Sequence, residues 1–348
     1  MPRVLFRVEA GKGVGLGHLQ RCLSLASALR NLGSESLFVA TGGSEARERV
    51  EHSGFEVVMM NLIAPGSDDD MSFVGRVATD RGCAAVVTDS YHINSAYQAT
   101  LRTSQLVVVG IDDLGQPPFT ADLIVNGSVL ATSLPYSEAP EGSLCLLGPS
   151  YAMLAQQYSD APVRDPNEGV VRILITMGGT DSGNFTSRLI SALDSLHEDF
   201  SLDIIVGPFN PNGAEIAEAV RRSQRTTDIQ NSPASLFDSI LSAQLVISAA
   251  GQTLYELAAT GTPTVAVQTA ENQMLNSAGF LERGCVLEAA LSSEESLDAA
   301  VVRQVRFLLA SRSRRIEMSK AGPKLVDGQG AFRVARAIIK ITDRVVAD

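Results

Sequence analysis

Several residue types are scarce in this sequence. The chain of 348 residues contains no Trp, and aromatic residues make up only 5% of it. Proteins that bind single-stranded nucleic acid stack the bases on aromatic side chains, so this composition argues against a base-stacking surface. The 28 Lys and Arg residues are outnumbered by 39 Asp and Glu residues, which gives a net charge of −11. A phosphate backbone requires a basic surface, so we expect no nucleic-acid partner.

Cysteines and long apolar runs are also scarce. The four cysteines, Cys22, Cys83, Cys145 and Cys285, are scattered, without a CxxC pair or a nearby His pair. This spacing predicts neither a zinc site nor a disulfide scaffold, and we expect no metal and no cofactor. No run approaches the 18 apolar residues of a membrane span, and the N-terminus lacks the apolar region of a signal peptide. We therefore expect a cytoplasmic protein without an integral membrane segment.

Short β-rich runs alternate with longer segments of helical period along the whole chain. The strands that this pattern predicts are Val4–Val8, Ser36–Ala40, Glu56–Met60, Ala84–Thr88, Leu106–Ile111, Arg172–Met177, Leu202–Val206, Gln244–Ser248 and Thr264–Gln268. The predicted helices are His18–Leu32, Asn184–Leu196, Ala214–Arg222, Thr253–Thr260, Asn272–Arg283 and Gly330–Val345. Such alternation is typical of α/β proteins whose parallel sheets carry helices on both faces.

The length and one linker suggest two domains. A chain of 348 residues is long enough for about two cores. The polar stretch Asp160–Gly169 contains two prolines and a glycine and is the best candidate for the boundary. We expect a doubly wound Rossmann-like domain over residues 1–160, a second one over 170–330, and a final helix over 331–348 that packs near the seam. Ligands bind beyond the carboxyl ends of such strands, so we expect the chemistry in a cleft between the domains.

A glycine-rich loop joins the first predicted strand to the first helix. It reads Gly11-Lys-Gly-Val-Gly-Leu-Gly-His18, and its glycines let the backbone approach a ligand closely. It lacks the spacing of a dinucleotide-binding loop. His18 stands at the start of the helix, where the helix dipole favours a neutral imidazole that can accept a proton. We expect His18 to be catalytic rather than a locally packed residue. Arg21, one turn further on, either contacts an anion or pairs with a neighbouring strand end.

Two further glycine turns follow strands in the second half. In the first, Met177–Asn184, glycines and Asp181 mirror the loop around Gly15. The second runs from Ile247 to Leu257, with Thr253 as the expected N-cap of a helix and Glu256 one turn inside it. A phosphate fits against such a helix start, and Glu256 could accept hydrogen bonds from a ribose diol. Alternatively, Glu256 is a surface residue.

Other polar residues have simpler interpretations. Asp68, Asp69 and Asp70 precede a helix, where acidic residues suit the helix dipole, and we expect them to face solvent. His92 follows a strand end and either faces solvent or lines a pocket.

Several motifs together resemble a known family. They are Gly15-Leu-Gly-His-Leu-Gln-Arg-Cys-Leu-Ser-Leu-Ala26, Thr88-Asp-Ser-Tyr91, Ile111-Asp-Asp-Leu114, Asp122-Leu-Ile-Val-Asn126, Gly148-Pro-Ser-Tyr151, Met177-Gly-Gly-Thr-Asp181, and Ser248-Ala followed by Glu256 and Asn272-Gln273. In this order they resemble the nucleotide-sugar hydrolases of pseudaminic acid biosynthesis and related spore coat polysaccharide biosynthesis proteins. The match extends over nearly the whole chain.

The resemblance implies a fold and a reaction. The family has the GT-B fold of glycosyltransferases, two Rossmann-like domains facing across a cleft. Its members hydrolyse a UDP-linked 2,4-diacetamido-2,4,6-trideoxyhexose to UDP and the free sugar, without a metal and with inversion. The general base would be His18. The sugar side would comprise Gly15, Gly17, Arg21, Asp89, Tyr91, Asp112 and Tyr151. The UDP side would comprise Gly178, Gly179, Asp181, Ser248, Gly251, Gln252, Thr253, Glu256, Asn272 and Gln273.

The chain departs from the family pattern near its first strand. Glu9 stands where these hydrolases more often have Asp, and Leu19-Gln20 replaces Val-Met or Ile-Met. Both changes concern the sugar side. Two alternatives to hydrolysis remain: a glycosyltransferase that passes the sugar of a UDP-sugar to a sugar or small-molecule acceptor, and a protein that binds nucleotide sugars without catalysis.

Overall fold

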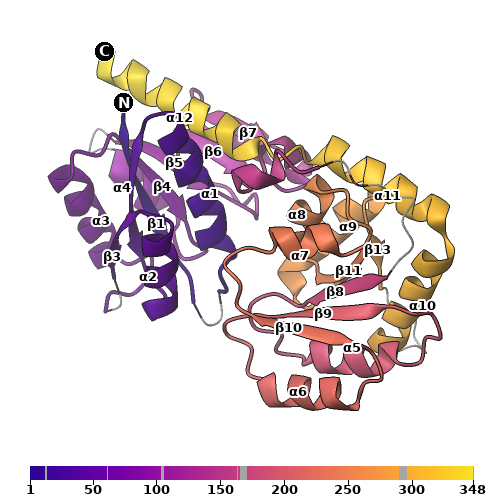
Figure 1. The fold of residues 1–348 in the computed structure, drawn as a ribbon. Helices are drawn as coiled ribbons and strands as arrows, with labels where there is room; N and C mark the ends of the chain where they lie inside the picture. Colours follow the sequence, from indigo (N-terminus) through magenta and orange to yellow (C-terminus); the bar gives the residue numbers. More distant parts are fainter. Residues whose placement is uncertain are drawn as a thin grey trace. The chain divides into compact units, whose positions relative to one another are not determined.

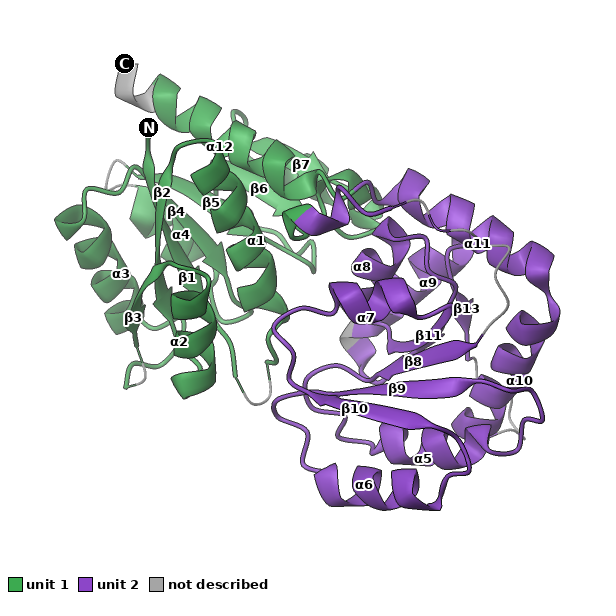
Figure 2. Ribbon diagram, viewed as in Figure 1, with its two compact units in different colours: residues 1–156, 328–348 green, residues 157–327 purple. Residues whose placement is uncertain are grey.

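The computed structural model describes residues 1–11, 14–60, 62–102, 106–162, 164, 171–289 and 296–347. They form two compact units (Figure 2): Met1–Gln156 together with Gly328–Asp348 make unit 1, and Gln157–Asp327 make unit 2. Most of the predicted linker, at positions 163 and 165–169, lies outside the described residues. The chain therefore leaves unit 1 after Gln156 and returns to it for its last helix.

Unit 1 contains a seven-stranded parallel sheet in the order β3-β2-β1-β4-β5-β6-β7 (Figure 1). Its strands are β1 (Arg3–Val8), β2 (Glu35–Ala40), β3 (Glu56–Met59), β4 (Ala85–Asp89), β5 (Val107–Ile111), β6 (Leu123–Asn126) and β7 (Leu144–Leu147). Its helices are α1 (Gly17–Asn31), α2 (Gly43–His52), α3 (Asp68–Asp80), α4 (Ser95–Arg102) and α12 (Gly330–Ala347), and its 3-10 turns include η3 (Pro149–Tyr151).

Unit 2 contains a six-stranded parallel sheet in the order β10-β9-β8-β11-β12-β13. Its strands are β8 (Arg172–Thr176), β9 (Ser201–Val206), β10 (Thr227–Asn231), β11 (Leu245–Ala249), β12 (Thr264–Val267) and β13 (Leu287–Glu288). Its helices are α5 (Phe185–Leu193), α6 (Gly213–Arg222), α7 (Phe237–Ser242), α8 (Thr253–Ala259), α9 (Met274–Glu282), α10 (Leu297–Ala310) and α11 (Arg312–Leu325), with a 3-10 turn η5 (Glu271–Gln273) before α9.

Alternate residues of the unit 1 strands face two apolar layers, because successive side chains of a strand point to opposite sides. Val4 and Phe6 of β1 pack in one layer with residues of α1 and α2 and with Val334 and Ile338 of α12. Leu5 packs in the other layer with residues of α3 and α4. Helices therefore cover both faces of this sheet, and the final helix is part of the core of unit 1.

The predicted alternation is confirmed: each predicted strand matches an observed one to within a residue at either end. The strands β6, β7, β10 and β13 were not predicted. β6, β7 and β13 have four residues or fewer. β10 reads Thr-Asp-Ile-Gln-Asn and is mostly exposed at the edge of its sheet. A short strand offers too few residues to establish a pattern, and a polar strand lacks the apolar run by which a buried strand is identified.

The prediction that Asp70 faces solvent is wrong. Asp70 is fully buried, and its carboxylate accepts hydrogen bonds from Nε and Nη2 of Arg7, at 2.9 and 2.8 Å, and from the hydroxyl of Tyr97 at 2.8 Å. A buried carboxylate requires such partners. Arg7 lies on β1, 63 residues away, so the local sequence around Asp70 does not reveal it.

Each sheet has a point at which its strand order reverses: between β1 and β4 in unit 1, and between β8 and β11 in unit 2. The loops that follow these paired strands diverge to opposite faces and leave a crevice between them, where α/β proteins bind ligands. Among the described helices, none is both long and apolar enough to cross a membrane.

Candidate functional site

His18 and Asp89 meet at the crevice of unit 1. His18 lies in the first turn of α1 and Asp89 is the last residue of β4. Both side chains are buried, and Nδ1 of His18 contacts Oδ1 of Asp89. A carboxylate at Nδ1 requires the proton on that nitrogen, so Nε2 carries the lone pair. The pair therefore holds the imidazole as a proton acceptor, the arrangement of catalytic His–carboxylate pairs.

Arg21, one turn along α1 from His18, joins two carboxylates. Its Nε and Nη2 donate to Oδ2 and Oδ1 of Asp89 at 2.7 and 2.6 Å. Its Nη1 donates to Oδ1 of Asp113 at 2.7 Å. Of the two interpretations of Arg21, the described structure therefore favours the pairing with strand ends. Two carboxylates against one guanidinium leave this cluster with a net charge of −1 while His18 is neutral.

The charges of this cluster stabilise one another. Burial raises the pKa of Asp89, but the charges and hydrogen bonds of Arg21 and His18 outweigh it and hold this pKa well below its usual range. Burial likewise lowers the pKa of Arg21, whereas Asp113 and Asp89 raise it well above its usual value. Asp89 and Arg21 therefore stay ionised around neutral pH, and Asp89 remains able to hold the proton on Nδ1 of His18.

Tyr91 contacts the imidazole of His18. Its ring packs edge-on against the ring of His18, with centroids 4.7 Å apart at an interplanar angle of 86°. Its hydroxyl donates to Oδ2 of Asp113 at 3.3 Å. About half of Tyr91 is exposed. Asp113 thus contacts both Arg21 and Tyr91, each of which contacts His18.

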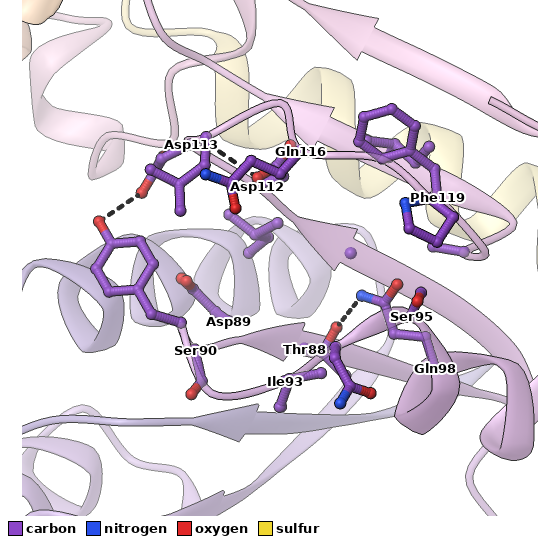
Figure 3. A pocket seen from close by; sticks show the side chains of 18 of the residues that line it. Thr88, Asp89, Ser90, Ile93, Ser95, Gln98, Asp112, Asp113, Gln116 and Phe119 are labelled. Atoms are coloured by element: carbon purple, nitrogen blue, oxygen red, sulfur yellow. Dashed lines mark hydrogen bonds between the residues drawn. The ribbon is translucent and has the colours of Figure 1, made fainter. Parts of the chain in front are cut away.

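A cavity of about 290 Å³ opens beside these residues (Figure 3). It lies within unit 1, at the carboxyl ends of β4 and β5, between the start of α4 and the loop over residues 112–119. Its polar lining includes His18, Arg21, Thr88, Asp89, Ser90, Tyr91, Asn94, Ser95, Gln98, Asp112, Asp113 and Gln116, and its apolar lining includes Ile93, Ile111, Leu114, Pro117, Pro118, Phe119, Ala121 and Ile124. This volume is at the small end of ligand pockets and suits a single small molecule.

Most of the sugar-side residues named from the resemblance line this cavity. They are Arg21, Asp89, Tyr91 and Asp112, and the expected base His18 lines it with them. Tyr151, in η3, packs instead against the core of unit 1. His92 is likewise outside the cavity lining; its Nδ1 contacts the buried carboxylate of Glu9 at 2.8 Å, which also accepts from Ser90 at 2.6 Å.

The glycine loop before α1 is closed by two backbone hydrogen bonds between Gly11 and Gly15, at 3.0 and 2.8 Å; residues 12 and 13 lie outside the described residues. Gly15 has a φ of 82°, which favours glycine. Gly17 has no such φ, and a Cβ built on it meets nothing within 4 Å. Neither backbone conformation nor packing therefore requires glycine at position 17, and the space beside it is open to a ligand.

In unit 2, the loop after β8 holds Gly178, Gly179 and Asp181. The carbonyl of Gly179 accepts from the N–H of Phe209 at 3.0 Å. Asp181 is buried, and its carboxylate accepts from the N–H groups of Phe185 and Thr186 at 2.8 and 3.0 Å. Asp181 therefore caps α5, and its carboxylate occupies the position at which an anion would meet this helix start.

The turn after β11 leads into α8. This helix begins at Thr253 and has Gln252 at its N-cap without a side-chain cap, so the prediction of Thr253 as the N-cap is wrong by one position. The hydroxyl of Ser248 is buried and donates to the carbonyl of Ala249 at 2.9 Å, which supports the turn from inside. The N–H groups of Leu254 and Tyr255, in the first turn of α8, donate to the carbonyls of Gly251 and Gln252 at 3.1 and 3.0 Å. A ligand would therefore meet this helix start at Gly251 to Thr253.

The loop after β12 meets this turn. Nε2 of Gln273 lies 3.9 Å from a Cβ built on Gly251, and its Oε1 accepts from the N–H of Thr269 at 2.9 Å. The side chain of Asn272 lies outside the described part of the structure. Gly251 and Gln273, from different loops, thus border one place at the crevice of unit 2.

Glu256 lies in the first turn of α8. Burial raises its pKa to about 7, while the neighbouring hydroxyl of Tyr158 acts in the opposite direction. A carboxyl group of this kind is about half protonated at neutral pH, and a ligand that donates hydrogen bonds to it favours the ionised form.

Among the described residues, no group of three or more His, Cys, Asp or Glu side chains is placed to hold a metal ion.

Comparison with known proteins gives distant relatives only. No protein-family model matches the chain. An uncharacterized protein of Methanocaldococcus jannaschii, MJ1062, is 24% identical over 271 residues, 75% of this chain and 54% of that protein. The spore coat polysaccharide biosynthesis protein SpsG of Bacillus subtilis is 26% identical over 166 residues, 47% of this chain and 48% of SpsG.

A third relative comes from Helicobacter pylori. It is named pseudaminic acid cytidylyltransferase and UDP-2,4-diacetamido-2,4,6-trideoxy-beta-L-altropyranose hydrolase, and it is 23% identical over 284 residues, 80% of this chain and 47% of that protein. The chain spans about half the length of the curated relatives that it matches.

Solved structures match over the whole chain. Staphylococcus aureus MnaA in complex with UDP has a TM-score of 0.71 and 13% identity and covers 100% of this chain and 98% of that one. Acinetobacter baumannii MurG has a TM-score of 0.67 and 16% identity, with 98% and 100% covered. The calicheamicin glycosyltransferase CalG4 has a TM-score of 0.63 and 15% identity, with 100% and 98% covered. The chain has a GT-B fold built from two Rossmann-like units, and the predicted fold class is confirmed.

Proposed function

We propose that this protein hydrolyses a UDP-linked amino or deoxy sugar, of the diacetamido-trideoxyhexose type, to UDP and the free sugar. The observation that carries the proposal is the buried His18–Asp89 pair at the edge of a cavity of about 290 Å³. Because Asp89 holds the proton on Nδ1, Nε2 of His18 can accept a proton from water.

The proposed step is one displacement. A water oxygen bonds to the anomeric carbon while the bond from that carbon to the β-phosphate oxygen breaks. The water proton passes to Nε2 of His18, and the electron pair of the broken bond leaves with UDP. Asp89 stays ionised and stabilises the imidazolium that forms. Attack from the face opposite the leaving group inverts the configuration of the anomeric carbon.

The net negative charge of the cluster around Arg21 favours an uncharged sugar, rather than a diphosphate, in the cavity of unit 1. Arg21 already pairs with Asp89 and Asp113, so the cluster has net negative charge. A diphosphate would be repelled there, whereas sugar hydroxyls can donate to carboxylates. The sugar would lie beside His18, Tyr91 and the backbone at Gly17.

Because a diphosphate would be repelled from the cavity of unit 1, we place the UDP in the crevice of unit 2. Asp181 caps α5, so we expect the phosphates at the start of α8, near Gly251 to Thr253, rather than at α5. Glu256 would accept hydrogen bonds from the ribose hydroxyls. Ser248 would support this turn, and Gly178, Gly179, Asn272 and Gln273 would border the nucleotide.

The names of the relatives fit this chemistry. The name of the Helicobacter pylori protein includes a UDP-sugar hydrolase, and that of the Bacillus subtilis protein includes polysaccharide biosynthesis. The alternative is a glycosyltransferase with a UDP-sugar donor, favoured by the fold that the chain has in common with the glycosyltransferase CalG4. The two reactions share the donor and differ in whether water or another hydroxyl attacks.

The test is a release assay with a panel of UDP-sugars, in which NMR follows UDP, the free sugar and its first-formed anomer. We expect the wild type to release free sugar with inversion, and His18→Ala to be roughly 10²- to 10⁴-fold slower with unchanged UDP binding. His52→Ala is the matched control, because His52 is exposed on α2. Turnover that begins only when a sugar acceptor is added would establish transfer, and an epimerised donor would establish epimerisation; either result excludes the hydrolase.

A further inference from the structure

The carboxamide of Gln98, on α4, lines the cavity in a fixed orientation. Its Nε2 donates to Oγ1 of Thr88 at 3.0 Å, and Oγ1 of Thr88 donates to the carbonyl of Val109 at 3.2 Å (Figure 3 shows the first bond). Because the single hydroxyl proton of Thr88 is used on Val109, the Thr88 oxygen must accept from Gln98. The nitrogen of the carboxamide therefore faces Thr88.

The same carboxamide keeps hydrogen-bonding capacity for a ligand. The hydroxyl of Thr120 lies 3.5 Å from Oε1 of Gln98 but 2.8 Å from the carbonyl of Ser95, and its one proton goes to the shorter bond. Within the described part of the chain, Oε1 of Gln98 thus has no short hydrogen bond from a donor, and Nε2 has a second N–H beyond the one given to Thr88. The side chain can offer one acceptor and one donor side by side.

The cavity wall near Gln98 is apolar. Phe119, Ala121 and Ile124 line it and are buried. Gly110 leaves the room that the carboxamide occupies, since a Cβ built on it would lie 2.8 Å from Nε2 of Gln98 and 3.4 Å from Cβ of Ala121. In Figure 3, Gln98 and Phe119 lie at the right of the view, below and above an open space, and Asp89 lies to the left of Gln98.

We propose that Gln98 and this apolar wall recognise an acylamino substituent of the sugar and so determine substrate specificity. A secondary amide offers a carbonyl and an N–H side by side and carries an apolar acyl group. Its polar atoms match the carboxamide, and its acyl group matches Phe119, Ala121 and Ile124. A hydroxyl at this place would leave the apolar wall unmatched. This inference rests on the proposed function, because it assumes that a sugar occupies the cavity.

The test compares donors that differ in one acylamino group: UDP-N-acetylglucosamine with UDP-glucose, and UDP-N-acetylgalactosamine with UDP-galactose. For each pair, kcat/KM for UDP release and saturation transfer from the protein to the sugar protons are measured. Gln98→Leu removes both the acceptor and the donor that the carboxamide would offer to the ligand, at similar side-chain volume. Gly110→Ala displaces the carboxamide without removing it. Thr100→Ala is the control, because Thr100 is exposed on the same helix.

We expect the wild type to prefer the acylamino member in both readouts. Gln98→Leu and Gly110→Ala should reduce this preference by roughly 10- to 100-fold, and Thr100→Ala should not change it. If the wild type had equal kcat/KM and equal saturation transfer for the two donors of each pair, the inference would be overturned, while the proposed hydrolysis would stand. A preference that survives in Gln98→Leu would also overturn it. Binding that depends on the acylamino group, without release of UDP from any donor, would overturn the proposed hydrolysis and support the subsite.

Discussion

Asp112 and Asp113 are adjacent in the chain, yet their carboxylates belong to different hydrogen-bond networks. Asp112 accepts from the N–H of Gly115 at 2.9 Å and from the hydroxyl of Tyr136 at 2.5 Å, which stabilises the loop behind β5. Asp113 accepts from Arg21 and so contacts the cluster around His18. One carboxylate therefore holds the cavity wall, and the other belongs to the site itself.

This difference predicts opposite effects for two neighbouring substitutions. Asp113→Asn should lower kcat about tenfold with little change in stability, since it weakens the placement of Arg21 and Tyr91. Asp112→Asn should instead cost about 1–3 kcal/mol of unfolding free energy, because charged hydrogen bonds to the loop are lost. Thermal unfolding and UDP release measured on both variants check this. The same loss of stability in both would contradict it.

Asp89→Asn tests the orientation of the imidazole. An amide cannot hold the Nδ1 proton as a carboxylate does, so we expect kcat to fall by about 10²- to 10⁴-fold while UDP affinity, measured by calorimetry, stays unchanged. Asp69→Asn, at an exposed position of α3, is the control. A rate within a few-fold of the wild type would show that Asp89 has no part in the reaction.

Glu256 predicts a pH dependence of nucleotide binding. Its pKa of about 7 means that it becomes ionised as the pH rises through neutrality, and ribose hydroxyls bind the ionised form. UDP affinity should therefore rise with pH and level off above 7, and fall by up to about tenfold per pH unit below it. Glu256→Gln should remove this component, and so should replacing UDP with its 2′-deoxy analogue. Identical pH profiles for the wild type and Glu256→Gln would exclude the assignment.

Two glycines of the N-terminal region should respond differently to alanine. At Gly17 a Cβ has open space, so Gly17→Ala should fold normally and reduce turnover if the sugar approaches this backbone. At Gly42 the φ is 123° and a Cβ would lie 2.3 Å from the carbonyl oxygen of Ala10. Gly42→Ala should therefore be destabilised by more than about 1 kcal/mol. Chemical denaturation and the release assay distinguish the two, and full activity of Gly17→Ala would argue against the close approach.

The buried Arg7–Asp70 pair predicts a stability effect away from the reaction. Arg7→Met should cost about 3–5 kcal/mol because it leaves the Asp70 carboxylate buried without its cation. The double variant Arg7→Met/Asp70→Leu should recover most of this loss, since neither charge remains. Urea unfolding of the two variants is the measurement. Equal instability of the single and double variants would show that shape, not charge, is what the pair provides.

The sequence predicts what local patterns encode. The glycine loop after β1 places His18 at the start of α1, and the apolar runs locate the strands. Both signals depend on neighbouring residues only. The partners of Asp70 and the hydrogen bonds of Gln98 depend on residues brought from other strands, as does the role of Asp113. The motif Ile111-Asp-Asp-Leu114 marks both acidic residues, but which carboxylate reaches Arg21 depends on the backbone direction at the end of β5. The predicted N-cap of α8 is wrong by one position, because Thr253 is a residue type that favours N-caps but is the first residue of the helix, after the observed N-cap Gln252.

The return of the chain to unit 1 affects the order in which the units can be completed. Unit 2 is one continuous segment, Gln157–Asp327, whereas unit 1 needs α12, whose Val334, Ala335 and Ile338 fill its core. During synthesis, domains fold once their residues have emerged. The sheet of unit 1 is therefore made first, but the face that α1 and α2 cover stays incomplete until α12 has also been synthesised. The unit that begins first in the chain is the one that finishes folding last.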